Sequence, residues 1–219
     1  MAKKVGVILS GCGVYDGAEV HEAVITMLAL DRRGADMVLC APDVAQLHVV
    51  NHLTGEVVDG ESRNVLVESA RIARGVIRDV AAVSADELDA LILPGGYGAA
   101  KNLCDFALAG PDCTVNPDVA RLVRAVHAHG KPVAAVCIAP ALLAKVLGEH
   151  QPKLTIGNDP ATAGALEKMG ARHVGCPVDG LVVDRERKLV STPAYMLATR
   201  ISEAAAGIEK AVDALLAMA

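Results

Sequence analysis

Residues 133–142 read VAAVCIAPAL, and this stretch decides the fold. A short buried-strand pattern over residues 132–136 runs directly into Cys137, and a helical pattern begins at once over residues 138–147. Small residues on both sides of the cysteine permit a sharp turn, which projects its side chain at the end of the strand. The stretch therefore predicts a nucleophile elbow between a strand and a helix.

The same alternation of short β-branched runs and longer helical patterns extends along the chain. Strands are expected at residues 4–9, 37–41, 90–93, 132–136 and 154–156, and a hairpin at residues 181–184 and 188–192. Helices are expected at residues 18–33, 64–73, 117–129, 138–147, 162–169 and 201–218, while residues 48–53 and 56–58 could be extended. Buried strands alternating with helices predict an α/β fold with a mostly parallel sheet covered on both faces. No repeat or linker marks a second domain, so residues 1–219 are expected to form one domain.

Composition narrows the class of protein. Of the 219 residues 53% are hydrophobic but only 2% are aromatic, which suits helices packed closely on a sheet. Rings that could stack on bases are nearly absent and the net charge is −5, so we expect no nucleic-acid partner. No run approaches the roughly 18 uninterrupted apolar residues of a membrane helix, so we expect no membrane partner.

The six cysteines show no framework for disulfides or metal. None pair as C-x-x-C and none stands with histidine at zinc-finger spacing, so the sequence predicts no metal site. A chain of this size and apolar content needs no disulfide, and we therefore expect a reducing, cytoplasmic location.

In parallel sheets covered on both faces, ligands bind beyond the carboxyl ends of the strands. This narrows the search to the loops that follow five predicted strands, after Leu9, Ala41, Leu93, Val136 and Ile156. Cys137 stands in one of them, near a helix N-terminus whose partial positive charge favours a thiolate. The alternative is a buried, unreactive cysteine, because free cysteines are commonly buried.

The loop after the first predicted strand reads SGCGVYDG over residues 10–17. Its G-x-G-x-x-x-G pattern allows a dinucleotide phosphate loop, in which Asp43 would hold a ribose. The alternative is a loop that brings its backbone and Cys12 close to the strand ends. Glu22, in the first turns of the next helix, would point toward the same cleft.

A second glycine-rich loop, LPGGYGAAKNL over residues 93–103, follows a central predicted strand. Backbone N–H groups at Gly95 and Gly96 could stabilise an oxyanion, whereas the alternative is an ordinary glycine turn. The same loop supplies Asn102 as a candidate substrate-binding residue. None of the seven histidines follows a predicted strand at a position that obviously faces Cys137, and His52, within NHLTG at residues 51–55, is the strongest candidate for a site role.

Three of these segments resemble the class I glutamine amidotransferase-like superfamily, which includes the PfpI-type peptidases and the Parkinsonism-linked deglycase/glyoxalase proteins. They are GAEVHE at residues 17–22, LPGG at residues 93–96 and AAVCIAP at residues 134–140. Within this superfamily, the sequence resembles the ElbB-like branch more closely than the others, and this resemblance extends over essentially the whole chain. The segments that carry this likeness are residues 7–17, 51–56 and 192–198.

The resemblance implies a flavodoxin-like three-layer sandwich that forms a homodimer. It implies Cys137 as the reactive elbow cysteine, Glu22 as its acidic partner, and oxyanion donors on the backbone around Gly96 and Ile138. Proteins of this branch are described as glutathione-independent glyoxalases, which convert the small dicarbonyl compound glyoxal to glycolate. The resemblance therefore implies a small dicarbonyl substrate and no cofactor.

One departure from the family pattern bears on the reaction class. Hydrolases and amidotransferases of the superfamily place a histidine near the elbow cysteine, either directly after it or after a later strand. This chain has Ile138 in the first position, and TIGND at residues 155–159 in the second. The Cys-His dyad expected for amide hydrolysis is therefore missing.

The predicted pair of Glu22 and Cys137 could exist in either of two protonation states. An ionised Glu22 would raise the pKa of the Cys137 thiol by repulsion, whereas a protonated Glu22 would donate a hydrogen bond to the thiolate. One hypothesis is a glyoxalase that uses a hemithioacetal on the cysteine, with the carboxyl group as proton shuttle. The alternative is a non-catalytic thiol redox sensor or stress-related binding protein with weak aldehyde activity, in which Cys12 lies nearby.

Overall fold

The computed structural model describes residues 2–219, and its centre is a seven-stranded sheet in the order β3-β2-β1-β4-β5-β9-β8. Six of these strands are mutually parallel, and β8 pairs antiparallel with β9 at one edge. The strands of this sheet are β1 (Lys4–Ile8), β2 (Asp36–Ala41), β3 (Arg78–Asp79), β4 (Ala90–Leu93), β5 (Val133–Val136), β8 (Val182–Asp184) and β9 (Leu189–Thr192). The mostly parallel sheet expected from the sequence is confirmed.

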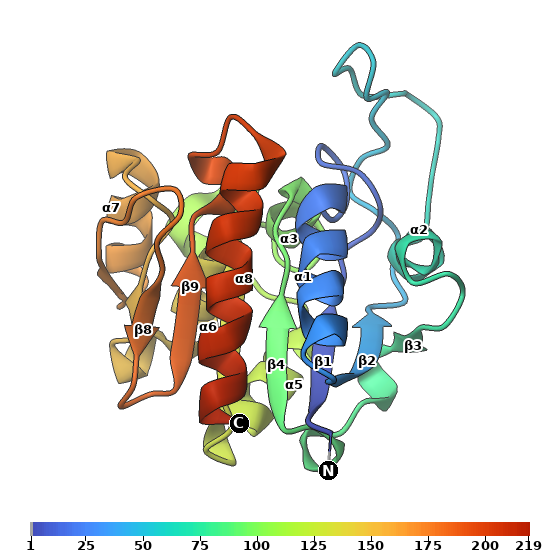
Figure 1. Cartoon of the computed structure of the whole chain (residues 1–219). Coiled ribbons are helices and arrows are strands. Elements are labelled where there is room, and N and C mark those ends of the chain that lie inside the picture. The colour runs from blue at the N-terminus through green and yellow to red at the C-terminus, as the bar shows by residue number, and fades with distance from the viewer. Residues whose placement is uncertain (1) are drawn as a thin grey trace.

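Helices cover both faces of the sheet, which gives three layers (Figure 1). The helices are α1 (Val20–Arg32), α2 (Val65–Ile72), α3 (Tyr97–Lys101), α4 (Phe106–Ala109), α5 (Pro117–Ala128), α6 (Pro140–Leu147), α7 (Pro160–Lys168) and α8 (Ile201–Met218). Helices α1 and α8 lie side by side in front of the sheet in Figure 1, and α5 and α6 lie behind it. This is the flavodoxin-like sandwich expected from the resemblance.

Strand β4 shows why the central strands read as continuous apolar runs. Its residues alternate between two separate cores: Ala90 and Ile92 pack with α1 and α8, while Leu91 and Leu93 pack with α5 and α6. All four side chains are fully buried. A strand with helices on both sides has no solvent face, so its hydrophobicity cannot alternate.

One expected strand and two segments that could be extended differ from the observed structure. Residues 154–156 were expected in the main sheet, but β6 (Lys153–Leu154) pairs with β7 (Arg172–His173) in a separate two-stranded sheet. The Thr155 N–H donates to the side-chain hydroxyl of Ser191 in β9 rather than to a backbone carbonyl, so this segment lies beside β9 without joining the main sheet. Residues 48–53 and 56–58 form only one isolated bridge, between Val50 and Val57, because their tip is exposed and packs on no neighbouring strand.

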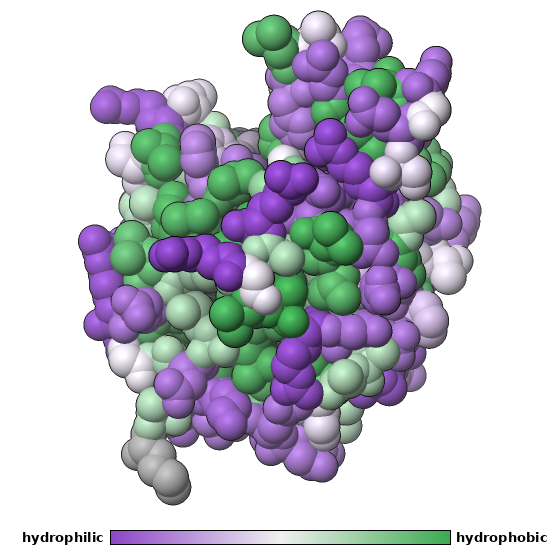
Figure 2. Space-filling view, turned by 90° about the vertical axis from the view of Figure 1, so that its right-hand side faces the viewer, coloured by the Kyte–Doolittle hydropathy of each residue, from purple (hydrophilic) through white to green (hydrophobic). Residues whose placement is uncertain are grey.

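The carboxyl ends of the parallel strands meet at one edge, the upper edge in Figure 1. Loops after β1, β4, β5 and β9 come together there, as parallel topology requires. Within residues 2–219 no helix is both long enough and apolar enough to cross a membrane. Figure 2 shows the side of the molecule near β3, where apolar patches alternate with polar side chains.

Candidate active site

Cys137 occupies a strained turn directly after β5. Its φ is +62°, in the left-handed region that residues other than glycine rarely adopt. The Cys137 N–H donates to the Thr192 carbonyl of neighbouring β9 at 2.9 Å, which holds the turn in register with the sheet. Helix α6 begins at Pro140, two residues later than the sequence predicts, because residues 137–139 are needed to reverse the chain.

Glu22 lies in the first turn of α1 and is completely buried. One carboxyl oxygen accepts a hydrogen bond from the Gly95 N–H at 3.0 Å, and the other accepts one from the Tyr195 N–H at 3.2 Å. A Cβ atom added to Gly95 would lie 2.6 Å from a Glu22 oxygen and would also collide with the Cys137 Cβ. A glycine at this position therefore allows the carboxyl group and the thiol to meet.

Burial dominates the electrostatics of this pair. It raises the pKa of Glu22 to about 8, although hydrogen bonds from backbone N–H groups act in the opposite direction. Burial, followed by the charge of Glu22, also raises the pKa of Cys137 well above the usual range for a thiol. At neutral pH the resting pair is thus a carboxylic acid beside a thiol, contrary to the thiolate that the helix N-terminus alone would favour.

The backbone supplies the groups that would stabilise negative charge on the sulfur. N–H groups of Gly96 and Ile138 hydrogen bond to it, and both lower the pKa of Cys137. These are the two positions expected to act as oxyanion donors. Gly95 differs from that expectation because its N–H is already bonded to Glu22.

A cavity of about 360 Å³ opens in front of the Cys137 side chain. Apolar groups make up most of its wall, and they come from the loops after β1, β5 and β9 and from α3 and α4. The principal apolar contributors are Val14, Tyr97, Phe106, Ile138 and Met196. Polar groups come from Glu19, Thr162 and Tyr195. The volume falls within the range of small-molecule sites.

Asn102 was expected to bind substrate, but it holds loops together instead. Its side-chain N–H groups donate to the carbonyls of Ser10 and Asp16, and its oxygen accepts the Leu47 N–H at 3.0 Å. Every strong hydrogen-bonding group of this amide is therefore engaged, and Asn102 is not among the residues that line the cavity.

His52 and Cys12 also lie outside the cavity wall. The His52 Nε2 accepts the Tyr15 N–H at 3.2 Å, and its ring lies 5.1 Å from the Tyr15 ring. Burial raises the pKa of Cys12, and the charges that act on it most strongly belong to Glu68 and Arg71 rather than to the Cys137 pair. The expectation that both residues contribute to the substrate site is not supported.

The phosphate-loop interpretation of residues 10–17 also fails. The N–H groups of its three glycines already have acceptors, since Gly11 donates to the Ser69 hydroxyl, Gly13 to the Ala18 carbonyl and Gly17 to the Gly13 carbonyl. None of these three groups is free for a phosphate. The ribose candidate Asp43 accepts a hydrogen bond from the Asn64 amide at 2.7 Å.

Three residues near the site were not singled out from the sequence. Glu19 caps α1 by accepting the Glu22 N–H at 2.7 Å, and it lines the cavity. The His21 Nδ1 lies 2.8 Å from the Tyr195 hydroxyl, although 174 residues separate them. Glutamate is not among the residues favoured at a helix N-cap, so the sequence carries no strong signal for this role of Glu19, and the Tyr195 contact depends on tertiary structure.

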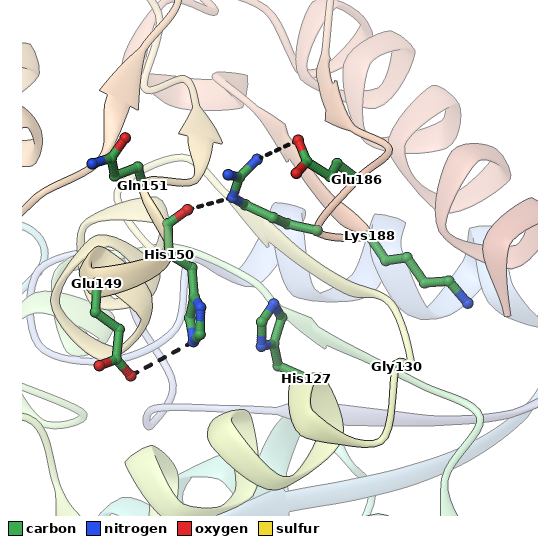
Figure 3. Close-up of a pocket in the computed structure, with 8 residues that line it drawn as sticks. His127, Gly130, Glu149, His150, Gln151, Glu186 and Lys188 are labelled. Atoms are coloured by element: carbon green, nitrogen blue, oxygen red, sulfur yellow. Dashed lines mark hydrogen bonds and ion pairs between the residues drawn. The ribbon is translucent and has the colours of Figure 1, made fainter.

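A second cavity, of about 500 Å³, lies at the opposite edge of the sheet, where β5 and β9 begin (Figure 3). His127 and His150 face each other there with ring centroids 4.9 Å apart. The ion pairs of Figure 3 join Glu149 to His150 and Glu186 to Arg187. The cavity contains no thiol, and residues 2–219 show no group of three side chains that could hold a metal ion.

Comparison with known proteins agrees with this geometry. The family model described as the DJ-1/PfpI family matches residues 8–192, which include Glu22, the glycine loop and the elbow. The chain belongs to the DJ-1/PfpI family. One similar protein is the human glutamine amidotransferase-like class 1 domain-containing protein 3, mitochondrial. It is 48% identical to this chain, and the alignment covers 91% of this chain and 77% of the human protein. The rat ES1 protein homolog, mitochondrial, is 45% identical to this chain, and the alignment covers 97% of this chain and 83% of the rat protein.

Solved structures extend the same comparison. The isoprenoid biosynthesis protein with amidotransferase-like domain from Ehrlichia chaffeensis superposes with a TM-score of 0.90 at 38% identity, covering 98% of this chain and 99% of that one. Glyoxalase III from Candida albicans, at 16% identity and a TM-score of 0.59 over 97% of each chain, shares the fold. The names of the human and rat relatives place those proteins in mitochondria, which does not match the cytoplasmic location expected for this DJ-1/PfpI member.

Proposed function

We propose that the protein is a glutathione-independent glyoxalase, which converts glyoxal and water to glycolate through a hemithioacetal on Cys137. The observation that carries the proposal is the fully buried Glu22 carboxyl group, held beside the elbow thiol at a pKa of about 8. Such a group can give and take protons near neutral pH. The reaction needs one nucleophile and one acid–base group, so it does not depend on the missing histidine.

The first half of the reaction forms a carbon–sulfur bond. When the pair loses one proton, the remaining proton is shared between carboxyl and sulfur, and the N–H groups of Gly96 and Ile138 stabilise the thiolate. The sulfur attacks one aldehyde carbon of glyoxal. Glu22 gives its proton to the aldehyde oxygen, which leaves a hemithioacetal beside a carboxylate.

The second half is an internal redox step followed by hydrolysis. The Glu22 carboxylate removes the hydrogen from the carbon bonded to sulfur, and the resulting enediol is protonated on the neighbouring carbon. The first carbon is thereby oxidised to a thioester and the second is reduced to an alcohol. Water cleaves the thioester, releases glycolate and restores the Cys137 thiol.

The redox-sensor alternative fits the geometry less well. A peroxide sensor needs a readily ionised, accessible thiol. Burial raises the pKa of Cys137 and leaves its residue only 7% exposed, whereas substrate held in the cavity would meet the sulfur directly. Cys12, the second thiol of that hypothesis, is not part of the cavity.

The test is glycolate formation from glyoxal by the purified full chain. We expect Cys137→Ala to abolish turnover and Glu22→Gln to reduce kcat by at least about 100-fold, because an amide cannot shuttle a proton. Cys12→Ala is the matched control and should retain activity. Glycolate production by Cys137→Ala at the wild-type rate, or none by the wild type, would contradict the proposal.

We also propose that the protein acts as a homodimer, as the resemblance implies. The supporting observation is an exposed apolar stripe on α1, formed by Val20, Val24 and Leu28 at successive helical turns. Such stripes on a surface helix commonly mark contacts between proteins.

A further inference from the structure

The wall of the Cys137 cavity is unusual in its charges. Among residues 2–219 its wall holds one carboxyl group, that of Glu19, and the phenol groups of Tyr97 and Tyr195 beside the thiol, but no lysine, arginine or histidine. Glu22 lies directly behind the sulfur as a second acidic group. Enzymes that bind carboxylates or phosphates commonly place an arginine or lysine side chain at the site, and the wall of this cavity has neither.

The nearest cations are held by other partners. The Lys101 ammonium group donates to the Tyr15 carbonyl at 3.1 Å and lies 5.0 Å from the centroid of the Tyr97 ring. His21 places its Nδ1 against the Tyr195 hydroxyl, and its side chain is 54% exposed. Neither side chain is part of the cavity wall, and the His21 Nδ1, 4.0 Å from the Glu19 carboxyl group, supplies positive charge only when its imidazole is protonated.

The position of Glu19 leaves one carboxyl oxygen available to influence a ligand. One oxygen accepts the N–H of Glu22, while the other lies 4.0 Å from His21. Glu19 is 9% exposed, so its charge acts through a poorly hydrated wall, where charges interact more strongly than in bulk water.

We propose that the cavity selects uncharged or cationic carbonyl compounds with an apolar substituent and rejects those that carry a carboxylate or phosphate, with Glu19 as the specificity-determining residue. The carbonyl part of this inference rests on the proposed glyoxalase function. A cavity of about 360 Å³ lined by Phe106, Ile138 and Met196 has room and apolar surface for a substituent that glyoxal lacks.

Charge selection can be measured without turnover, by the reaction of Cys137 with two methanethiosulfonate reagents. The ethylammonium and ethylsulfonate reagents carry the same reactive group with opposite charges, and each leaves a mixed disulfide on the sulfur and releases methanesulfinate. Rates at individual cysteines of the full chain are read by peptide mass spectrometry. We expect the ammonium-to-sulfonate rate ratio at Cys137 to exceed that at half-buried Cys12 by about ten-fold or more.

Variants assign the effect to one side chain. Glu19→Gln removes the charge but keeps an oxygen that can accept the Glu22 N–H, and it should bring the Cys137 ratio down toward the Cys12 ratio. Glu56→Gln removes an exposed carboxylate that does not line the cavity, and it should leave the ratio unchanged. Equal rates for both reagents, no reaction at Cys137, or a ratio that Glu19→Gln leaves unaltered would overturn the inference.

A matched pair of substrates links this selection to the proposed reaction. Phenylglyoxal and 4-carboxyphenylglyoxal share the reacting carbons and differ by one negative charge. We expect kcat/KM to be at least about ten-fold higher for phenylglyoxal, and Glu19→Gln to narrow the difference. If the two reagents react at different rates but neither compound is turned over, the glyoxalase proposal is wrong and the charge selection holds. If both compounds are turned over with equal kcat/KM values, the charge selection is wrong and the glyoxalase proposal holds.

Discussion

Glu22 is an acidic residue that the fold keeps protonated. Its two oxygens accept N–H groups from Gly95 and Tyr195, yet burial outweighs both and raises the pKa to about 8. In the unfolded chain the same group ionises near 4.5. Folding therefore retains a proton on this carboxyl group across the physiological range, which links the chemistry of the site to the stability of the protein.

The linkage predicts how stability changes with pH. Between about pH 4.5 and 8 the unfolded chain releases the Glu22 proton and the native state keeps it, so this residue's contribution to the unfolding free energy falls as pH rises. The loss is on the order of 3–5 kcal/mol across the window. Glu22→Gln removes this term, so the variant should gain stability relative to the wild type from pH 5 to pH 8.

Urea unfolding at several pH values measures this difference, and Glu56→Gln is the control for loss of an exposed carboxylate. Parallel stability curves for Glu22→Gln and the wild type would show that Glu22 is already ionised in the native state at pH 5.

At the residue scale, the sequence could predict the position of a side chain where the local backbone pattern places it. Cys137 and Glu22 each follow from a strand end or a first helical turn, whose position the local pattern predicts. Asn102 and His52 could not be assigned in this way. Their side chains bond to Asp16, Leu47 and Tyr15, and those contacts exist only after separate loops have come together.

At the scale of elements, helix α3 is a feature that the glycine-rich sequence of residues 93–103 did not predict. The sequence predicts a turn with exposed N–H groups, but residues 97–101 form a short helix whose backbone packs on the loop after β1. A Cβ atom on Gly98 would lie 2.5 Å from the Gly17 carbonyl carbon and from the Ser10 oxygen. Both are backbone atoms, so neither can rotate away.

Two helical glycines give a matched test of this packing. Gly98→Ala should lower the unfolding free energy by at least about 2 kcal/mol, because backbone must move to admit the methyl group. Gly164→Ala, on α7 where nothing lies within 4 Å of the added Cβ, should raise it by up to about 1 kcal/mol through helix propensity. Thermal unfolding measures both; equal effects of the two substitutions would rule out close packing at Gly98.

At the scale of the whole molecule, topology assembles the candidate site from distant segments. Residues 19–22, 95–98, 137–138 and 195–196 meet because parallel strands deliver their loops to one edge. The sequence predicts this edge well, since short apolar strand patterns alternate clearly with longer helical patterns. It does not predict that β6 leaves the main sheet, because a strand of two residues carries too little pattern to reveal its partner.

The exposed apolar stripe on α1 predicts that the protein associates with a second copy of itself. Exposed apolar residues occur on more than one helix: Val24 on α1 is 48% exposed, and Val67 on α2 is 61% exposed. Only the α1 residue belongs to a stripe with Val20 and Leu28. We expect a dimer in sedimentation equilibrium at micromolar concentration, and Val24→Asp should weaken it at least about ten-fold by burying an unpaired charge. Val67→Asp should leave the dimer intact. A monomeric wild type, or equal dissociation constants for both variants, would place the contact elsewhere or remove it.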